Sequence, residues 1–241
     1  MIKETLHNLY SELSSGTTLV AVSKFHPFSS IVEAYAAGQR IFAESRPQEL
    51  LAKQKELEEL RSSYGDDYMR ELKWHFIGHL QTNKLKMVLP YVTLVESVDS
   101  VKLLDAIETW GANNSKTTNV LLEYFISEDD TKQGLTREEI LSILTGHDSY
   151  PHIVFKGLMG MATHTSDEAI IRRDFKKIPD LVADITQLAQ ASSGKGSITV
   201  ANIDLEHLEM SFGMSGDYKL AIQMGATLVR IGTKIFGPRT I

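Results

Sequence analysis

The chain has 241 residues, 42% of them hydrophobic, which is enough to bury a large core in one domain or in two small ones. Its formal net charge of -6, with no basic stripe, argues against nucleic acid as a partner, and the absence of cysteine excludes disulfides, thiolate metal sites and a cysteine nucleophile. The N-terminal segment has no signal-peptide core, and no apolar run approaches the roughly 20 residues of a membrane-spanning helix, so we expect a cytoplasmic protein with no membrane partner.

Short apolar runs alternate with amphipathic segments along the whole chain, which is typical of repeated strand–helix units around a parallel sheet. A helix is expected before the first strand. Eight runs are predicted to be strands, at residues 19–24, 40–44, 74–78, 93–98, 119–126, 153–159, 207–212 and 227–232. Helices are predicted at residues 29–37, 48–61, 101–110, 137–144, 174–191 and 217–224, with polar connections at 62–67, 113–118 and 192–197.

This order of elements predicts an α/β fold, a single-domain (β/α)8 TIM barrel over residues 1–241 with an extra N-terminal helix. The length is close to the roughly 250 residues typical of such barrels. A doubly wound open sheet is the main alternative. It would show fewer strands and, for a dinucleotide, a G-x-G-x-x-G turn after the first strand, where this chain reads SKFHP at 23–27.

Lys24 stands at the C-terminal end of the first predicted strand, the rim where barrel enzymes place their chemistry. Strand periodicity puts Val20, Val22 and Lys24 on one face, so the amine enters the mouth if that face points inward. Burial and a nearby cation would lower the pKa of this amine and allow it to attack an aldehyde. A solvated rim lysine is the alternative interpretation.

Two stretches rich in glycine and hydroxyl groups follow the last two predicted strands, where barrels commonly bind phosphate. They are MSFGMSGD at 210–217 and RIGT at 230–233. Glycine allows close approach of the backbone, Ser211 and Thr233 offer hydroxyls, and a helix beginning after Gly232 would add partial positive charge. The glycines could equally do no more than end the two strands.

Arg230 shares one face of the last predicted strand with Leu228 and Gly232, so its permanent charge can point inward. If this guanidinium lies opposite a pyridine nitrogen, it would keep that nitrogen unprotonated. The unprotonated ring would then be a weak electron sink, poorly suited to transamination. The alternative is an ion pair with a strand-end carboxylate such as Glu44 or Glu123.

Two further patterns of charged residues and histidines are not interpreted as functional sites. The charged run at 53–61 is interpreted as the solvated face of a helix. His75 and His79 lie four residues apart, but on a strand this spacing separates them by roughly 13 Å, so we do not expect them to share a metal.

Several segments together resemble the pyridoxal 5′-phosphate (PLP) homeostasis family, often called YggS or PROSC-like proteins, whose fold is similar to the barrel domain of alanine racemase. The similarity covers nearly the whole chain. It is carried by LVAVSK at 19–24, GQRIF at 38–42, WHFIGHLQTNK at 74–84, GLM at 157–159, MSFGMS at 210–215 and VRIGTKIFG at 229–237.

The resemblance implies a fold type III PLP-binding barrel in which Lys24 forms the Schiff base with the cofactor. It assigns Ser211, Gly232 and Thr233 to the phosphate and Arg230 to the pyridine nitrogen. One departure concerns the cofactor-binding residue Ser45. The family commonly reads Gly-Glu-Asn-Tyr after the second strand, whereas this chain reads AESR at 43–46, so the usual asparagine is a serine.

The expected function is PLP homeostasis, in which the protein holds PLP and transfers it, with PLP-dependent apoenzymes as candidate recipients, without turnover and as a monomer. An amino-acid racemase of the same fold is the alternative. Racemisation needs a second acid/base group on the opposite side of the cofactor, and the chain is expected to end without residues to supply it. A third reading is a phosphate-binding barrel enzyme that uses Lys24 on a substrate carbonyl without PLP.

Overall fold

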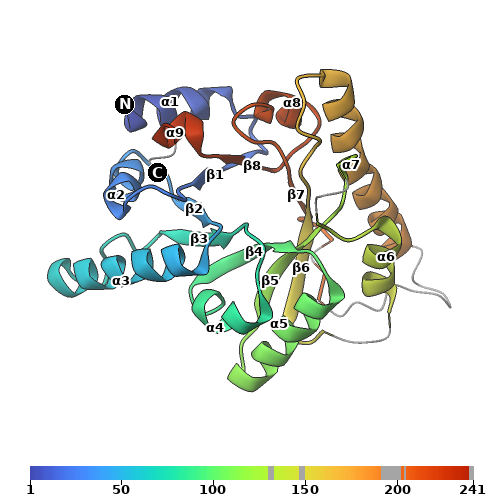
Figure 1. Ribbon diagram of the computed structural model, residues 1–241, viewed down its shortest axis with the longest axis horizontal. Coiled ribbons are helices and arrows are strands. Elements are labelled where there is room, and N and C mark those ends of the chain that lie inside the picture. The colour runs from blue at the N-terminus through green and yellow to red at the C-terminus, as the bar shows by residue number, and fades with distance from the viewer. Residues whose placement is uncertain (130–132, 147–149, 191–201, 204, 239–241) are drawn as a thin grey trace.

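The computed structural model describes residues 1–129, 133–146, 150–190, 202–203 and 205–238. Eight parallel strands close into a barrel in the order β1 to β8, and helices surround it (Figure 1). The strands are β1 (Thr18–Val22), β2 (Ile41–Glu44), β3 (Lys73–Phe76), β4 (Val92–Val98), β5 (Thr118–Glu123), β6 (Ile153–Met159), β7 (Glu209–Ser211) and β8 (Leu228–Ile231). The predicted (β/α)8 barrel is therefore confirmed.

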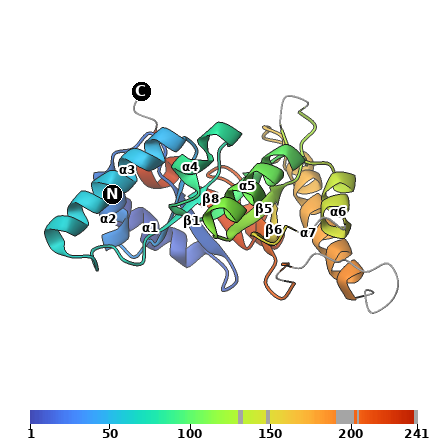
Figure 2. The ribbon, with the colours of Figure 1, turned by 90° about the horizontal axis from the view of Figure 1, so that it is seen from below.

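The helical elements lie outside this barrel, with α3 and α7 on opposite sides of the molecule (Figure 2). They are α1 (Ile2–Glu12), α2 (Phe28–Ala36), α3 (Pro47–Tyr64), the 3-10 turn η1 (Thr82–Lys84), α4 (Leu85–Val88), α5 (Val101–Asn114), α6 (Arg137–Thr145), α7 (Glu168–Gln190), α8 (Tyr218–Gln223) and α9 (Thr233–Phe236). None of the helices described combines the length and the apolarity that crossing a membrane requires.

Local signals explain where several helices begin. Thr136 and Glu139 form a reciprocal capping box at the start of α6, and the Ser100 side chain accepts a hydrogen bond from the Leu103 amide at the start of α5. Pro47 occupies the first turn of α3, where its missing N–H costs nothing.

Some predicted boundaries are wrong. Helix α3 continues through residues 62–64 of the expected loop and ends at Gly65, whose φ of 99° suits glycine. Helix α7 begins at Glu168, six residues before the predicted start, and no prediction covered η1 and α4. The polar connection expected at 192–197 lies outside the described residues.

Strand alternation divides the core into two clusters. The barrel interior holds Val20, Val22, Ala43, Leu94, Leu121, Met159 and Leu228, and a larger cluster fills the space between the strands and the helices. The face that Val20 and Val22 share therefore points into the barrel, which is the condition under which the Lys24 amine was expected to enter the mouth.

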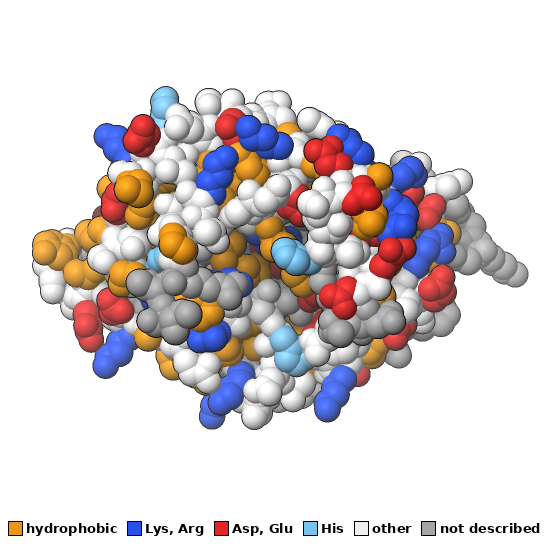
Figure 3. Space-filling model, turned by 45° about the horizontal axis from the view of Figure 1, so that its top comes forward, with side chains coloured by type: hydrophobic (Ala, Val, Ile, Leu, Met, Phe, Trp, Pro, Cys, Tyr) orange, Lys and Arg blue, Asp and Glu red, His pale blue; other side chains and the backbone are white. Residues whose placement is uncertain are grey.

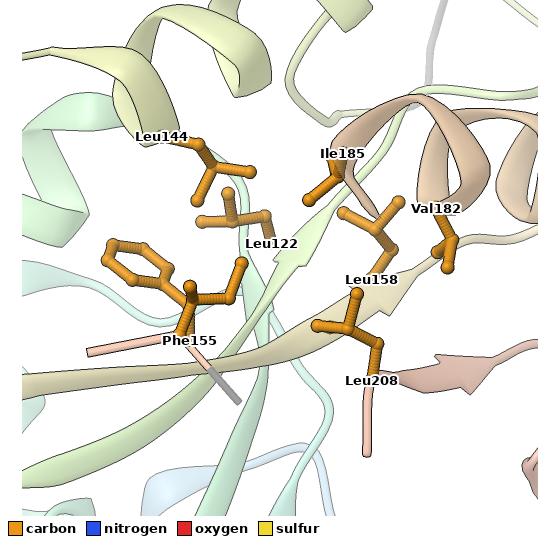
Figure 4. A pocket seen from close by; sticks show the side chains of 9 residues that line it. Leu122, Leu144, Phe155, Leu158, Val182, Ile185 and Leu208 are labelled. Carbon is orange, nitrogen blue, oxygen red and sulfur yellow. The ribbon is translucent and has the colours of Figure 1, made fainter. Parts of the chain in front are cut away.

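One part of the outer cluster is imperfectly packed. Side chains from β5, β6, α6 and α7 leave a gap of about 10 Å³, with Leu122, Leu158 and Ile185 among the residues that line it (Figure 4). All the side chains drawn around this gap are hydrophobic, and its volume is near the smallest that can hold one water molecule. We therefore treat it as a packing defect and not as a binding site.

The chain ends of the barrel lie side by side. Strand β1 pairs with β8 in parallel, with Thr18 opposite Leu228 and Ala21 opposite Ile231. Helices α1 and α9 are neighbours on the outside of this seam (Figure 1), where Tyr218 at the start of α8 donates to Glu12 and accepts from Lys234 at 2.6 Å. These contacts connect the extra N-terminal helix to the last strand–helix unit.

Gly157 allows the close packing of β6 against β7 to be tested. This residue of β6 has a φ of 141°, and a β-carbon added to it would lie 2.0 Å from the carbonyl oxygen of Glu209 on β7. Gly157→Ala should therefore displace β7 and lower the free energy of unfolding by about 3 kcal/mol. Chemical denaturation measures the loss, and Gly16→Ala, at a glycine with open space around it, is the control. Equal stability of the two variants would contradict this account of β6 and β7.

Candidate functional site

The barrel opens into a cavity at the C-terminal ends of its strands. Its volume is about 590 Å³, within the roughly 300–1,000 Å³ typical of small-molecule sites. The space-filling view shows a hollow near the centre of the molecule in which hydrophobic and basic side chains are visible (Figure 3). Four predicted site residues line this cavity together: Lys24, Arg230, Gly232 and Thr233.

Lys24 lies two residues beyond β1, in a tight turn, and is half-buried against the cavity. The following residue, Phe25, has a φ of 67° and donates its backbone N–H to Glu49 at 2.8 Å. The guanidinium of Arg46 covers the Phe25 ring, 4.3 Å from the ring centroid. The turn that presents Lys24 is thus held by contacts with the segment that begins α3.

A buried ion pair lies directly behind this turn. Lys53 of α3 donates to Glu44 at 2.6 Å and to the carbonyl oxygen of Ser23 at 2.8 Å, and the Ser23 hydroxyl donates to the same Glu44 oxygen at 2.6 Å. Burial raises the pKa of Glu44 by more than the neighbouring Lys53 lowers it. The interpretation of the charged run at 53–61 as a solvated face is therefore wrong for Lys53, which is only 5% exposed.

The glycine-rich loops contribute a polar wall. Ser215 and Gly216, from the loop between β7 and α8, face the cavity together with Thr233. Gly232 also packs against β1, because a β-carbon added there would lie 2.9 Å from the carbonyl oxygen of Val22. The sequence prediction singled out Ser211 in the segment at 210–217, although Ser215 is the serine of that segment in the described lining of the cavity.

Arg230 points into the barrel and is only 4% exposed. Its Nη1 donates to the Ser211 hydroxyl at 2.5 Å, and its Nη2 donates to the carbonyl oxygen of Gly160 at 3.0 Å. Its closest carboxylate among the described ion pairs is Glu96, at 3.8 Å, rather than the suggested Glu44 or Glu123. Glu96 could have been noticed as a charged residue at an inward position of β4, two residues after Leu94.

Two predicted site residues do not belong to the described lining of the cavity. Ser211 is fully buried beneath it, between Arg230 and Glu96. Ser45 is half-buried just after β2, with its backbone against Gly78, where an added β-carbon would lie 2.1 Å from the Ser45 carbonyl oxygen. Both assignments to the cofactor therefore stay predictions.

Carboxyl groups also gather at the ends of β4 and β5. Glu123, 7% exposed, ends β5 on the same face as the inward Leu121. Asp99 follows β4, and its carboxylate oxygen Oδ2 forms a hydrogen bond with Nδ1 of His79 at a distance of 2.6 Å. Burial and the Asp99 charge raise the pKa of Glu123 to about 7, against opposing contributions from Arg230 and His79.

Glu123 makes the stability of the fold depend on pH. Its pKa is higher in the fold than in the unfolded chain, so the protonated carboxyl stabilises the fold at low pH, and this contribution is lost as pH rises through about 7. Glu123→Gln should therefore raise the free energy of unfolding by about 3 kcal/mol at about pH 8 and change it little at about pH 4. Urea denaturation at both pH values measures this, with exposed Glu56→Gln as the control; equal gains at the two pH values would contradict it.

The similarity to known proteins extends over the whole chain. Residues 1–240 match the family model described as alanine racemase, N-terminal domain. The pyridoxal phosphate homeostasis protein of Haemophilus influenzae is 34% identical over 221 residues, which are 92% of this chain and 84% of that protein. The human protein of the same name is 36% identical over 228 residues, covering 92% of this chain and 76% of its own length.

Solved structures give the same result. PipY of Synechococcus elongatus, solved with PLP bound, is 31% identical and superposes with a TM-score of 0.80, covering 98% of this chain and 100% of that one. Alanine racemase of Corynebacterium glutamicum, 14% identical with a TM-score of 0.66, shares the fold over all of this chain and 61% of its own. The chain therefore belongs to the pyridoxal phosphate homeostasis proteins, within the alanine racemase N-terminal domain family.

Proposed function

We propose that this protein binds PLP in the cavity at the C-terminal ends of the strands and serves PLP homeostasis. The observation that carries the proposal is the presence of an amine, a guanidinium and a hydroxyl- and glycine-rich wall in one cavity, contributed by Lys24, Arg230, Ser215, Gly232 and Thr233. PLP has an aldehyde, a pyridine nitrogen and a phosphate, so each group finds a chemically suitable partner. The name shared by the relatives and the PLP bound to PipY support the same assignment.

Each residue has a distinct task in this proposal. PLP supplies an aldehyde that captures amines and a ring that can withdraw electrons. Lys24 would hold the cofactor as a Schiff base between its amine and the aldehyde, with water as the leaving group. The backbone at Gly232 and the hydroxyls of Thr233 and Ser215 would hold the phosphate. Arg230 would donate to the pyridine nitrogen, which would weaken the ring as an electron sink.

The predicted roles of Ser211 and Ser45 are part of the proposal. For Ser211 to donate to a phosphate, its hydroxyl proton would have to leave Glu96, to which it lies 2.5 Å away. Ser45 is separated from the described lining of the cavity, so a contact through an ordered water suits its short side chain.

The biological role proposed is that of a carrier without turnover, which holds PLP and releases it to PLP-dependent apoenzymes. The naming of the relatives as homeostasis proteins supports this role, and the weak electron sink argues against transamination. The proposal includes a single domain over residues 1–241, a monomer, a cytoplasmic location, and no nucleic acid or membrane partner. The net charge of -6 supports the absence of nucleic acid.

Covalent trapping tests the PLP site. After incubation with PLP, the protein should be yellow, and borohydride should fix one pyridoxyl group on Lys24, because reduction turns the imine into a stable amine. Peptide mass spectrometry locates the label. Lys24→Ala should remain unlabelled, and Lys55→Ala, on the exposed face of α3, should label like the wild type. A colourless wild-type protein that borohydride leaves unmodified would refute the proposal.

An amino-acid racemase is the second candidate, favoured by the fold shared with alanine racemases. The carrier proposal predicts no exchange of the α-hydrogen of free amino acids with deuterium from the solvent when the PLP-loaded protein is incubated with each of them. Proton NMR follows that exchange. If the wild type turns over any amino acid and the Lys24→Ala variant does not, the racemase is established instead.

A further inference from the structure

A column of polar side chains crosses the interior of the barrel, beginning at Arg230 in the lining of the cavity. It joins four strands, with His75 on β3, Glu96 on β4, Ser211 on β7 and Arg230 on β8. His75 Nδ1 lies 2.6 Å from one oxygen of Glu96, the other Glu96 oxygen lies 2.5 Å from the Ser211 hydroxyl, and Arg230 Nη1 lies 2.5 Å from the same hydroxyl. Glu96 and Ser211 have no exposed surface.

The chemistry of these groups determines the direction of every hydrogen bond in the column. A guanidinium can only donate, so the Ser211 oxygen accepts from Arg230 and its single proton goes to Glu96. The remaining Glu96 oxygen then accepts from His75, which must carry a hydrogen on Nδ1. Burial alone would raise the pKa of Glu96, but the His75 hydrogen bond and the charges of His75 and Arg230 outweigh it and lower that pKa.

Arg230 has little freedom while the column is intact. Its two terminal nitrogens are held in different directions, Nη1 by Ser211 and Nη2 by the carbonyl oxygen of Gly160. Glu96 supplies the nearby negative charge that a buried guanidinium requires. The other carboxyls whose charges act on Arg230 are Glu123 and Asp217, so loss of Glu96 would draw the guanidinium toward these two groups.

We propose that Glu96, oriented by His75, is a positioning residue that fixes Arg230 for its contact with the ligand in the cavity. This inference rests on the proposed binding of PLP, whose pyridine nitrogen Arg230 would face. The column also gives Ser211 a task separate from phosphate binding, because its hydroxyl is the bridge between Glu96 and the guanidinium.

The test replaces Glu96 by glutamine in the PLP-loaded protein. The glutamine amide has one oxygen and can no longer accept from both neighbours, so Arg230 should turn away and the ring nitrogen should become free to take a proton. The absorbance of bound PLP should then gain a pH-dependent transition that the wild type lacks. PLP should also dissociate about tenfold faster. Unchanged spectra and dissociation in a folded Glu96→Gln protein would overturn the proposal.

Two sets of variants separate positioning from a general effect on folding. His75→Asn keeps a donor toward Glu96, so its PLP absorbance and PLP dissociation rate should match those of the wild type. His75→Phe removes that donor, so both properties should change in the same direction as in Glu96→Gln. The control is Glu108→Gln, which breaks a His–Glu pair of the same 2.6 Å length, with His152, on the outside of the barrel. If His75→Phe leaves PLP binding unchanged while Glu108→Gln alters it, the column has no positioning role.

A measurement without PLP separates this inference from the proposed function. Nitrogen-15 NMR of the unloaded protein should show slowly exchanging side-chain hydrogens on His75 Nδ1 and on Arg230, both lost in Glu96→Gln. If the wild type takes up no PLP, the proposed function fails, and these NMR signals still decide whether Glu96 holds Arg230. Rapid exchange of both hydrogens in the wild type would overturn the column itself.

Discussion

A guanidinium buried inside a barrel requires compensation, and this requirement organises the polar part of the interior. Much of the barrel interior is filled by apolar side chains such as Val20 and Leu121, which need only fit. Arg230 interrupts that filling with a buried charge, which is compensated by a carboxylate, a hydroxyl and a backbone carbonyl from three other segments. The burial of Glu96 and Ser211 inside the barrel is therefore explained by one inward residue on β8.

The same rule applies outside the barrel wall, behind the other principal residue of the cavity. Lys53 and Glu44 are buried between α3 and the ends of β1 and β2, and they share the backbone and side chain of Ser23, the residue before Lys24. The half-buried amine thus follows a segment that is pinned by an ion pair, while the guanidinium across the cavity is pinned by a second. Rigid support from outside the cavity is what a preorganised binding site needs.

The local elements of this fold follow from the sequence, whereas the contacts between its strands do not. Alternation of apolar residues was sufficient to predict eight strands, a barrel and which residues share a face of β1 and of β8. Lys53 was misread because a charged run looks solvated until its buried partner, Glu44, is known. The role of Glu96 does not follow from its inward position alone, because two of its partners, Ser211 and Arg230, lie more than a hundred residues further along the chain.

The seam between β1 and β8 has a consequence for how the protein is made. Lys24 follows the first strand and Arg230 lies on the last, so the two become neighbours only when the chain ends pair. During synthesis, every other strand leaves the ribosome before the one that carries the guanidinium. A nascent chain that lacks β8 lacks Arg230, Gly232 and Thr233, so the complete lining of the cavity exists only after the last strand has joined the barrel.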